Sequence, residues 1–386
     1  MSSLNTKVAF ESHNKLKLNL WIKILDGISQ LLCLTVPNLY NYNGLSVWYL
    51  LYSLTFVALL YFLLVWNVKL KIDSYYRIID KTSTLDVLVM FSYSFINSFI
   101  ILHTVFFRRK SLILGIRQLE ELYNAFNLSP YINKSKTFVI FGASSHLKFA
   151  AILVVVVSFH FLRIEQLQAL LHVHTLVNLY IIIINTLQII NYCHMLETLF
   201  YNLNKNLKFI ITKNKHDINK PVKMEAMLKL HDKLCDAQHS FNDVLGLPII
   251  LLCGLVTLNC LQTINLILEF KLSLNEVSID VHLSDVLVSV AITGILLSSM
   301  FSIGYSTNRS NRESHLTHHM CQQILIEFST TNRNVGVTQY SLQLYEQLKY
   351  RNPYFIAAHC FIVDVTIISR IVGMVLAHVV MLLQFD

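Results

Sequence analysis

The sequence predicts an all-α, polytopic membrane protein with seven transmembrane helices, in a single domain over residues 1–386. Three observations support this fold class. First, 54% of the residues are hydrophobic and only 14% are charged, whereas soluble domains carry about 25% charged residues. Second, the apolar residues gather in runs of roughly 20, the length that a helix needs to cross a bilayer. Third, Lys and Arg concentrate between alternate runs, as they do in cytoplasmic loops.

Seven segments are long and apolar enough to cross a membrane. Each is rich in Leu, Ile, Val and Phe on every face, which is typical of helices that are buried or span a membrane. They lie at about 45–67, 85–107, 141–162, 170–196, 245–268, 286–308 and 354–385. A further stretch, 18–40, mixes Lys23, Asp26 and Pro37 with Leu and Ile. We interpret it as a half-buried helix before the first span, and an eighth span is the alternative.

The distribution of Lys and Arg predicts which end of each span faces the cytoplasm. With the N-terminus inside, the inside segments hold 24 of the 31 Lys and Arg residues, the outside loops hold 6, and Arg370 lies within the last span. Because positive charge is concentrated on the cytoplasmic side of membrane proteins, the N-terminus is predicted to be cytoplasmic. With seven spans, the C-terminus is then extracellular.

The end of the last segment carries a family resemblance. It reads Ala377-His378, five apolar residues, and then Gln384-Phe385. This ending resembles the closing signature of insect gustatory receptors, in which Thr-Tyr precedes five apolar residues and Gln-Phe. Ala377 and His378 stand where Thr and Tyr are usual, so the chain resembles a divergent member of that family.

Two other stretches extend the resemblance. The upstream part of the last segment is similar to the family's pattern at Phe355, Ala358, Phe361 and Asp364. The stretch 230–251, with Asn242 and Gly246 leading into the fifth span, is similar as well. Chain length, span number and predicted orientation agree with the same family.

The resemblance implies a tastant-gated, non-selective cation channel in the plasma membrane of chemosensory neurons. It implies a tetramer, formed by this chain alone or with other gustatory receptors, in which the last helix of each subunit lines the pore. No cofactor is implied. The resemblance leaves the tastant open among sugars, bitter compounds and carbon dioxide.

The last helix supplies the candidate pore and gate residues. Four copies of Gln384 would place a ring of amide dipoles at the outer end of a pore, and Val380, Leu383 and Phe385 would form an apolar constriction that gates by dewetting. The alternative for Gln384 is an interfacial residue that simply faces water.

Polar and aromatic residues in the outer halves of the spans are the candidate ligand pocket, because small-molecule sites combine aromatic walls with a few polar groups. The alternative role for each is hydrogen bonding between helices, which membrane bundles use widely. The candidates are Tyr93, Ser94, Asn97, His160, His172, His174, Asn178, Tyr180, Asn259, Gln262, Asn265, Glu269, Ser289 and Thr293.

Two further groups have open roles. Asp364 and Arg370 are charges within the last predicted span, where they are costly unless they face protein or water. His315, His318 and His319 share one face of a predicted helix, the spacing of a zinc site. The favoured interpretation is that this cytoplasmic helix packs against a neighbouring subunit, so no metal site is predicted.

Other protein classes fit less well. An insect odorant receptor is a related alternative, and the Gln384-Phe385 ending favours the gustatory branch. G-protein-coupled receptors also have seven spans. In that class, however, the N-terminus lies outside, and the Asp/Glu-Arg-Tyr motif of that class is missing from this chain. No paired carboxylates, HExxH pattern or Gly-rich phosphate loop appears, so an enzyme is not predicted.

Overall fold

The computed structural model describes residues 27–32, 34, 47–74, 81–126, 166–212, 220–273, 279–329, 335–351 and 353–385. Within them the chain forms long α-helices, one π-helical turn and a hairpin of two strands with two residues each. The α-helices are α2 (Val47–Ser74), α3 (Lys81–Leu102), α4 (Arg109–Ala125), α6 (Gln166–Thr212), α7 (Lys220–Ser273), α8 (Ile279–Ser329), α9 (Val335–Tyr350) and α10 (Ile367–Phe385). The π-helix η1 (His103–Phe107) joins α3 to α4, and strands β1 (Ile356–Ala357) and β2 (Phe361–Ile362) precede α10.

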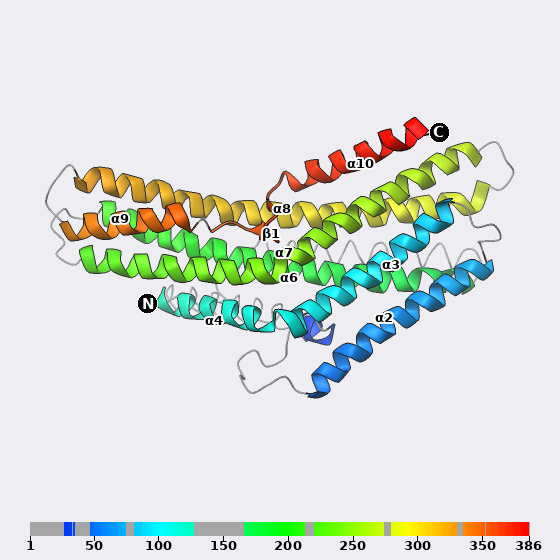
Figure 1. Ribbon diagram of the computed structural model, residues 1–386, viewed down its shortest axis with the longest axis horizontal. Helices are drawn as coiled ribbons and strands as arrows, with labels where there is room; N and C mark the ends of the chain where they lie inside the picture. Colours follow the sequence, from blue (N-terminus) through cyan, green and yellow to red (C-terminus); the bar gives the residue numbers. More distant parts are fainter. Residues whose placement is uncertain are drawn as a thin grey trace, which may run out of the picture.

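The bundle is elongated, with α6, α7 and α8 running along its length (Figure 1). At one end α4 packs against α7, and α9 packs against both α7 and α8. In the other half α2 and α3 lie on one side of the bundle, and α10 diverges on the other (Figure 1). The predicted helical fold class is therefore confirmed.

Five helices are long and apolar enough to span a membrane in the described part of the chain. They contain the first, second, fourth, fifth and sixth predicted segments, and the apolar stretch Ile367–Met381 of α10 belongs to the last. The third predicted segment, about 141–162, lies outside the described residues.

Three helices are much longer than a bilayer is thick. At 47, 54 and 51 residues, α6, α7 and α8 extend about 70–80 Å at ~1.5 Å per residue. A hydrocarbon core is only about 30 Å thick. Each helix therefore continues well beyond its apolar stretch, into a second bundle with α4 and α9.

The contact between α4 and α7 illustrates this second bundle. Lys233 Nζ of α7 lies 2.9 Å from Glu121 Oε2 of α4, and Arg117 on α4 lies 3.4 Å from the same carboxylate. The hydrogen bond and the charge of Lys233 lower the pKa of Glu121. Where the sequence predicts a cytoplasmic loop, the chain thus forms solvated helices joined by surface ion pairs.

The last predicted segment is not one continuous helix. Residues 354–366 form an antiparallel hairpin, in which Ile356 pairs with Ile362 and Ala357 with Phe361, and α10 begins only at Ile367. Its 19 residues match a core of about 30 Å at ~1.5 Å per residue. Although glycine weakens a helix, α10 continues through Gly373 without interruption.

The start of the hairpin turn and the start of α10 have local causes. Ala358 and His359 adopt φ values of 41° and 61°, the left-handed conformation that reverses the chain. The carboxylate of Asp364 accepts a hydrogen bond from the Thr366 amide at 3.0 Å and another from its hydroxyl at 2.5 Å. Such N-capping satisfies a free helical N–H and starts the helix.

Part of the predicted half-buried helix 18–40 is described. Within 27–32, the carbonyls of Gln30 and Leu31 accept hydrogen bonds from Tyr49 at 3.3 Å and Tyr52 at 2.6 Å, both on α2. The rest of this stretch, apart from residue 34, lies outside the described residues.

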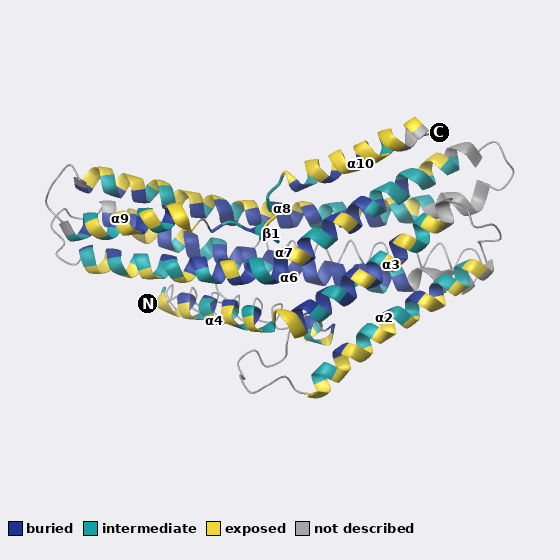
Figure 2. Cartoon of the chain, viewed as in Figure 1, coloured by how far each residue is buried: buried dark blue, intermediate teal, exposed yellow. Residues whose placement is uncertain are grey.

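Burial divides the helices into central and peripheral ones. The middle of α6 is almost entirely buried, whereas α2 exposes many residues on its outer side (Figure 2). The exposed side chains of α2 include Trp48, Phe62 and Trp66. Apolar surface of this kind suits contact with lipid tails.

Candidate functional site

A buried polar cluster joins α3 to α6. The Ser94 hydroxyl lies 2.6 Å from His174 Nε2, and Asn97 Nδ2 donates to the backbone and side-chain oxygens of Asn178 at 3.0 and 2.7 Å. All four side chains are fully buried. Among the described residues, His174 Nδ1 and Asn97 Oδ1 are buried without a hydrogen-bond partner, which costs about 1–3 kcal/mol for each atom.

A second polar cluster joins α3, α7 and α8. The Tyr93 hydroxyl donates to Asn259 Oδ1 at 3.0 Å, and Thr293 donates to the Asn259 carbonyl at 3.4 Å. The Thr263 hydroxyl lies 2.7 Å from that of Ser289 and 2.8 Å from that of Thr293. Because Tyr93 and Ser94 are adjacent on α3, the two clusters meet at this helix.

A third contact closes the same end of the bundle. Lys71 of α2 forms an ion pair with Asp86 of α3, and Gln262 Nε2 donates to the other Asp86 oxygen at 2.7 Å. One turn along α7, Asn265 donates to Glu269 at 3.4 Å. These bonds tie α2, α3 and α7 together beside the second cluster.

Most of the predicted pocket residues are therefore brought together, largely through hydrogen bonds to one another. Tyr180 on α6 is half-buried. His172 lies in α6, but its side chain is not described, and His160 lies outside the described residues. Sequence reasoning missed Thr263 and Lys71 as partners in these clusters.

The sequence around Thr263 and Lys71 explains why these two residues were missed. Thr263 is one residue after Gln262, within a span that carries many polar residues, so nothing local distinguished it. The single acidic residue of the second span, Asp86, was the available signal for Lys71, because a charge at membrane depth calls for a partner.

The helix predicted to line the pore has one packed face and one unpacked face. Ile367, Ile371 and Val375 are buried, and α10 packs against α7 and α8. The opposite face is exposed at Leu376 and Val380, at 58% and 53%. Of the other candidate pore residues, Gln384 is exposed, and the side chains of Leu383 and Phe385 are not described.

The two charges expected at membrane depth lie near the start of α10. Asp364 caps the helix and so precedes it in the chain. The Arg370 guanidinium lies 5.0 Å from the centre of the Phe361 ring, a cation–π contact within the chain. Neither charge needs a partner from a distant helix.

The three clustered histidines make separate contacts. His315 Nε2 lies 2.9 Å from the Tyr354 hydroxyl, and the His318 ring packs against Tyr345. No group of three or more candidate metal ligands occurs among the described residues. Contacts between neighbouring segments of the same chain account for His315 and His318. The expected packing against a neighbouring subunit stays a prediction.

Comparison with known proteins assigns the chain to a family. A family model described as 7tm Chemosensory receptor matches residues 27–386, so the chain belongs to this chemosensory receptor family. This confirms the resemblance to insect chemoreceptors, a family of receptors rather than enzymes. The chain is accordingly a multi-pass membrane protein. No curated protein matches the sequence.

Solved structures show the same fold. The insect olfactory receptor OR5 from Machilis hrabei is 12% identical, with a TM-score of 0.51, and the match covers 97% of this chain and 100% of the receptor. The same receptor in complex with eugenol is 11% identical, with a TM-score of 0.52 and the same coverage. The likeness extends over essentially the whole chain.

Proposed function

We propose that this protein is a gustatory receptor that acts as a tastant-gated, non-selective cation channel. The channel is a tetramer in the plasma membrane of chemosensory neurons, formed with further copies of the chain or with other gustatory receptors. The last helix of each subunit, α10, lines the pore. The observation that carries the proposal is the exposed face of α10, which has no partner within the described chain.

The composition of this face favours contact with other subunits over contact with lipid. The exposed face of α2 bears Trp48, Phe62 and Trp66, whereas the exposed positions of α10 include Gly373 and Ala377 and carry no Phe, Tyr or Trp. Small residues allow helices to approach closely in membranes, where packing rather than hydrophobicity drives association.

The far end of α10 supplies the permeation path. The exposed Gln384 contributes an amide that carries a dipole without a fixed charge, which suits a pore that passes several cations. Val380, with Leu383 and Phe385, forms the apolar constriction. Such constrictions close by losing water and open when they widen.

The tastant binds at the polar clusters between α3, α6, α7 and α8. They combine an imidazole, amides, hydroxyls and the ring of Tyr93, and they leave two polar atoms without partners in the described part of the chain. A small molecule with hydroxyl or carbonyl groups matches this chemistry. The eugenol complex of the similar receptor supports a small-molecule ligand.

The gustatory branch is favoured over the odorant branch by the ending of the chain. Five apolar residues followed by Gln384-Phe385 resemble the gustatory signature, although the family and fold matches do not separate the two branches. An odorant receptor channel is the alternative. A G-protein-coupled receptor has no support from the family or the fold.

The pore assignment is tested by Gln384→Ala in voltage-clamped cells that express the chain. Sugars, bitter compounds and carbon dioxide are applied to find an activating stimulus. The substitution should change relative cation permeability or block, and leave agonist potency close to that of the wild type, because Gln384 is on α10 and the polar clusters are formed by α3, α6, α7 and α8. Gln343→Ala, an exposed glutamine on α9, is the control. Unchanged permeation in an active Gln384→Ala channel would refute the pore role.

A further inference from the structure

The hairpin that leads into α10 is held to α7 by one side-chain amide. Asn242 Nδ2 donates to the Tyr354 carbonyl at 2.7 Å, and Asn242 Oδ1 accepts from the Ile356 amide at 3.2 Å. The side chain thus bonds a backbone acceptor and a backbone donor two residues apart. A neighbouring β-strand would bond the same two backbone groups with its own N–H and C=O. Here the side-chain amide of a helical asparagine takes the place of that strand.

A second amide holds the same hairpin to α8. Asn311 Oδ1 accepts from the Phe355 amide at 3.1 Å, and Asn311 Nδ2 donates to the Val363 carbonyl at 3.4 Å. The Val363 amide in turn donates to the Phe355 carbonyl at 2.8 Å. Asn311 therefore binds both ends of the hairpin, where they are already joined to each other.

Two glycines allow the hairpin to approach the helices this closely. A Cβ atom on Gly246 of α7 would lie 2.5 Å from the Ala358 nitrogen, and one on Gly304 of α8 would lie 2.5 Å from the Asp364 carbonyl oxygen. Real Cβ atoms do not make such contacts. The hairpin is therefore seated on the helix backbones as well as bonded to the two amides.

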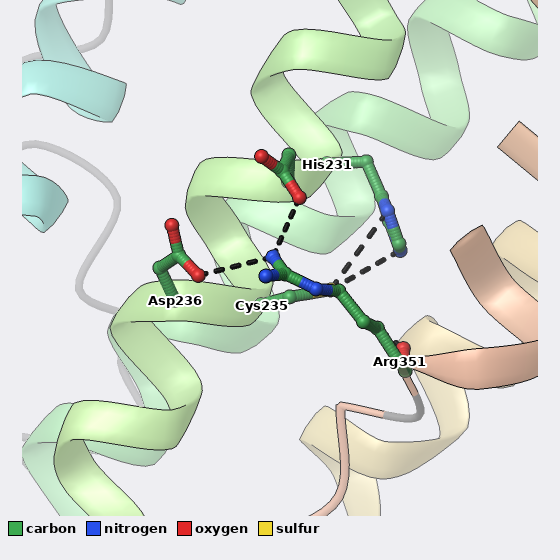
Figure 3. A network of polar contacts seen from close by, with 5 residues as sticks. His231, Cys235, Asp236 and Arg351 are labelled. Atoms are coloured by element: carbon green, nitrogen blue, oxygen red, sulfur yellow. Dashed lines mark hydrogen bonds and ion pairs between the residues drawn. The ribbon is translucent and has the colours of Figure 1, made fainter.

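An ion pair holds the chain just before the hairpin. The Arg351 guanidinium, beyond the end of α9, lies 2.6 Å from Asp232 and 3.1 Å from Asp236 on α7. Figure 3 shows the arginine reaching across to this helix beside Cys235. All three charged side chains are about half exposed, so this contact is weaker than the amide bonds.

The hairpin is also joined firmly to α10. Asp364 at its end caps α10, and Arg370 of the first turns packs over Phe361 of strand β2. A movement of the hairpin relative to α7 and α8 must therefore move the start of α10.

The same two helices reach the polar clusters. Asn259 and Asn242 lie on α7, and Thr293 and Asn311 lie on α8. Each pair is separated by roughly 25 Å along its helix, at ~1.5 Å per residue. Both helices thus contact a polar cluster at one level and hold the hairpin at another.

We infer that Asn242 and Asn311 are positioning residues that hold the start of α10 on α7 and α8, and that the channel opens when this hold is released. This inference rests on the proposed role of α10 as the pore helix. The bonds of the two amides stabilise the seated arrangement of the hairpin relative to arrangements in which it has left α7 or α8. Their loss therefore shifts the equilibrium toward opening.

The test compares Asn242→Ala and Asn311→Leu with controls on the same two helices. Leu keeps the branched shape of Asn311 but forms no hydrogen bond. Gln238→Ala on α7 removes a buried amide that has no hydrogen-bond partner among the residues that the structure describes. Asn308→Ala removes an exposed amide one turn from Asn311 on α8. Agonist-free cation current is divided by the amount of receptor at the cell surface, so poor folding is not mistaken for altered gating.

Asn242→Ala and Asn311→Leu should each raise the open probability without agonist about fivefold, as expected for the loss of a net hydrogen bond or two. The two control substitutions should leave it unchanged. Hydrogen exchange on the purified full chain should become faster at the Phe355 amide in Asn311→Leu and at the Ile356 amide in Asn242→Ala. Faster exchange with unchanged or reduced current would overturn the inference and leave the channel intact. Unchanged exchange would show that the amides do not hold the hairpin. A wild-type chain that never conducts, either alone or expressed together with other gustatory receptors, would refute the proposed function, and the inference would fall with it.

Discussion

At the scale of single residues, the polar groups inside the bundle bond mainly to one another. Ser94 with His174, and Asn97 with Asn178, are buried pairs between α3 and α6. The sequence alone predicted that these residues face the protein interior in one half of the membrane. It did not predict the pairs, because the rotation of each helix about its axis depends on packing that no local pattern records.

The bond between Tyr93 and Asn259 is a direct test of the polar clusters. Tyr93→Phe removes only the hydroxyl and should lower stability by about 0.6 kcal/mol, the average for interhelical hydrogen bonds in membranes. It should also shift agonist potency, because the hydroxyl belongs to the proposed binding site. Thermal unfolding of the purified protein and dose–response curves measure the two effects.

Ser92→Ala is the matched control on α3. Ser92 is half-buried, and its hydroxyl donates to the Leu88 carbonyl of its own helix. Equal changes in potency for Tyr93→Phe and Ser92→Ala would show that the cluster has no special part in ligand response.

At the scale of elements, the apolar segments identified from hydropathy in the described chain lie within helices that extend beyond them. The helices α6, α7 and α8 continue far past their apolar parts. Hydropathy does not predict these extensions, because a polar helix in a second bundle has no hydropathy signal. The hairpin before α10 was missed for the opposite reason. Phe355, Ala357 and Val363 are buried, so the hairpin is as apolar as a span.

Two features marked this interruption in the sequence. Asn352-Pro353 disfavours helix at its start, because the residue before a proline avoids the helical conformation. Asp364, two residues before Thr366, is a typical helix N-cap.

The close seating of the hairpin predicts unequal effects of alanine at two glycines of α8. Gly304→Ala places a Cβ against the Asp364 carbonyl, so it should destabilise the protein by about 1–3 kcal/mol, as overpacking does. It should also raise agonist-free current by displacing the start of α10. Gly294 has no neighbour within 4 Å of an added Cβ, so Gly294→Ala should be neutral or stabilising by about 0.5–1 kcal/mol.

Thermal unfolding and current per surface receptor distinguish these outcomes. If the two substitutions behaved alike, the hairpin would not be seated on α8 as described.

At the scale of the whole molecule, the fold and the charge distribution suggest the same division of the chain. The polar halves of α6, α7 and α8, together with α4 and α9, form the end that the Lys and Arg count places in the cytoplasm. The apolar halves, with α2, α3 and α10, form the membrane part. The sequence predicted this division because both hydropathy and charge are averaged over many residues, whereas the site depends on a few contacts.

The proposed function is tested most directly in its homotetrameric form, in which this chain alone conducts cations when a ligand binds. The purified full-length protein is placed in planar lipid bilayers that contain no other protein, and sugars, bitter compounds and carbon dioxide are applied. We expect discrete cation currents that a stimulus increases, with relative permeability altered by Gln384→Ala. Ligand binding to the reconstituted protein without any current, in bilayers where its presence is verified, would contradict a channel formed by this chain alone.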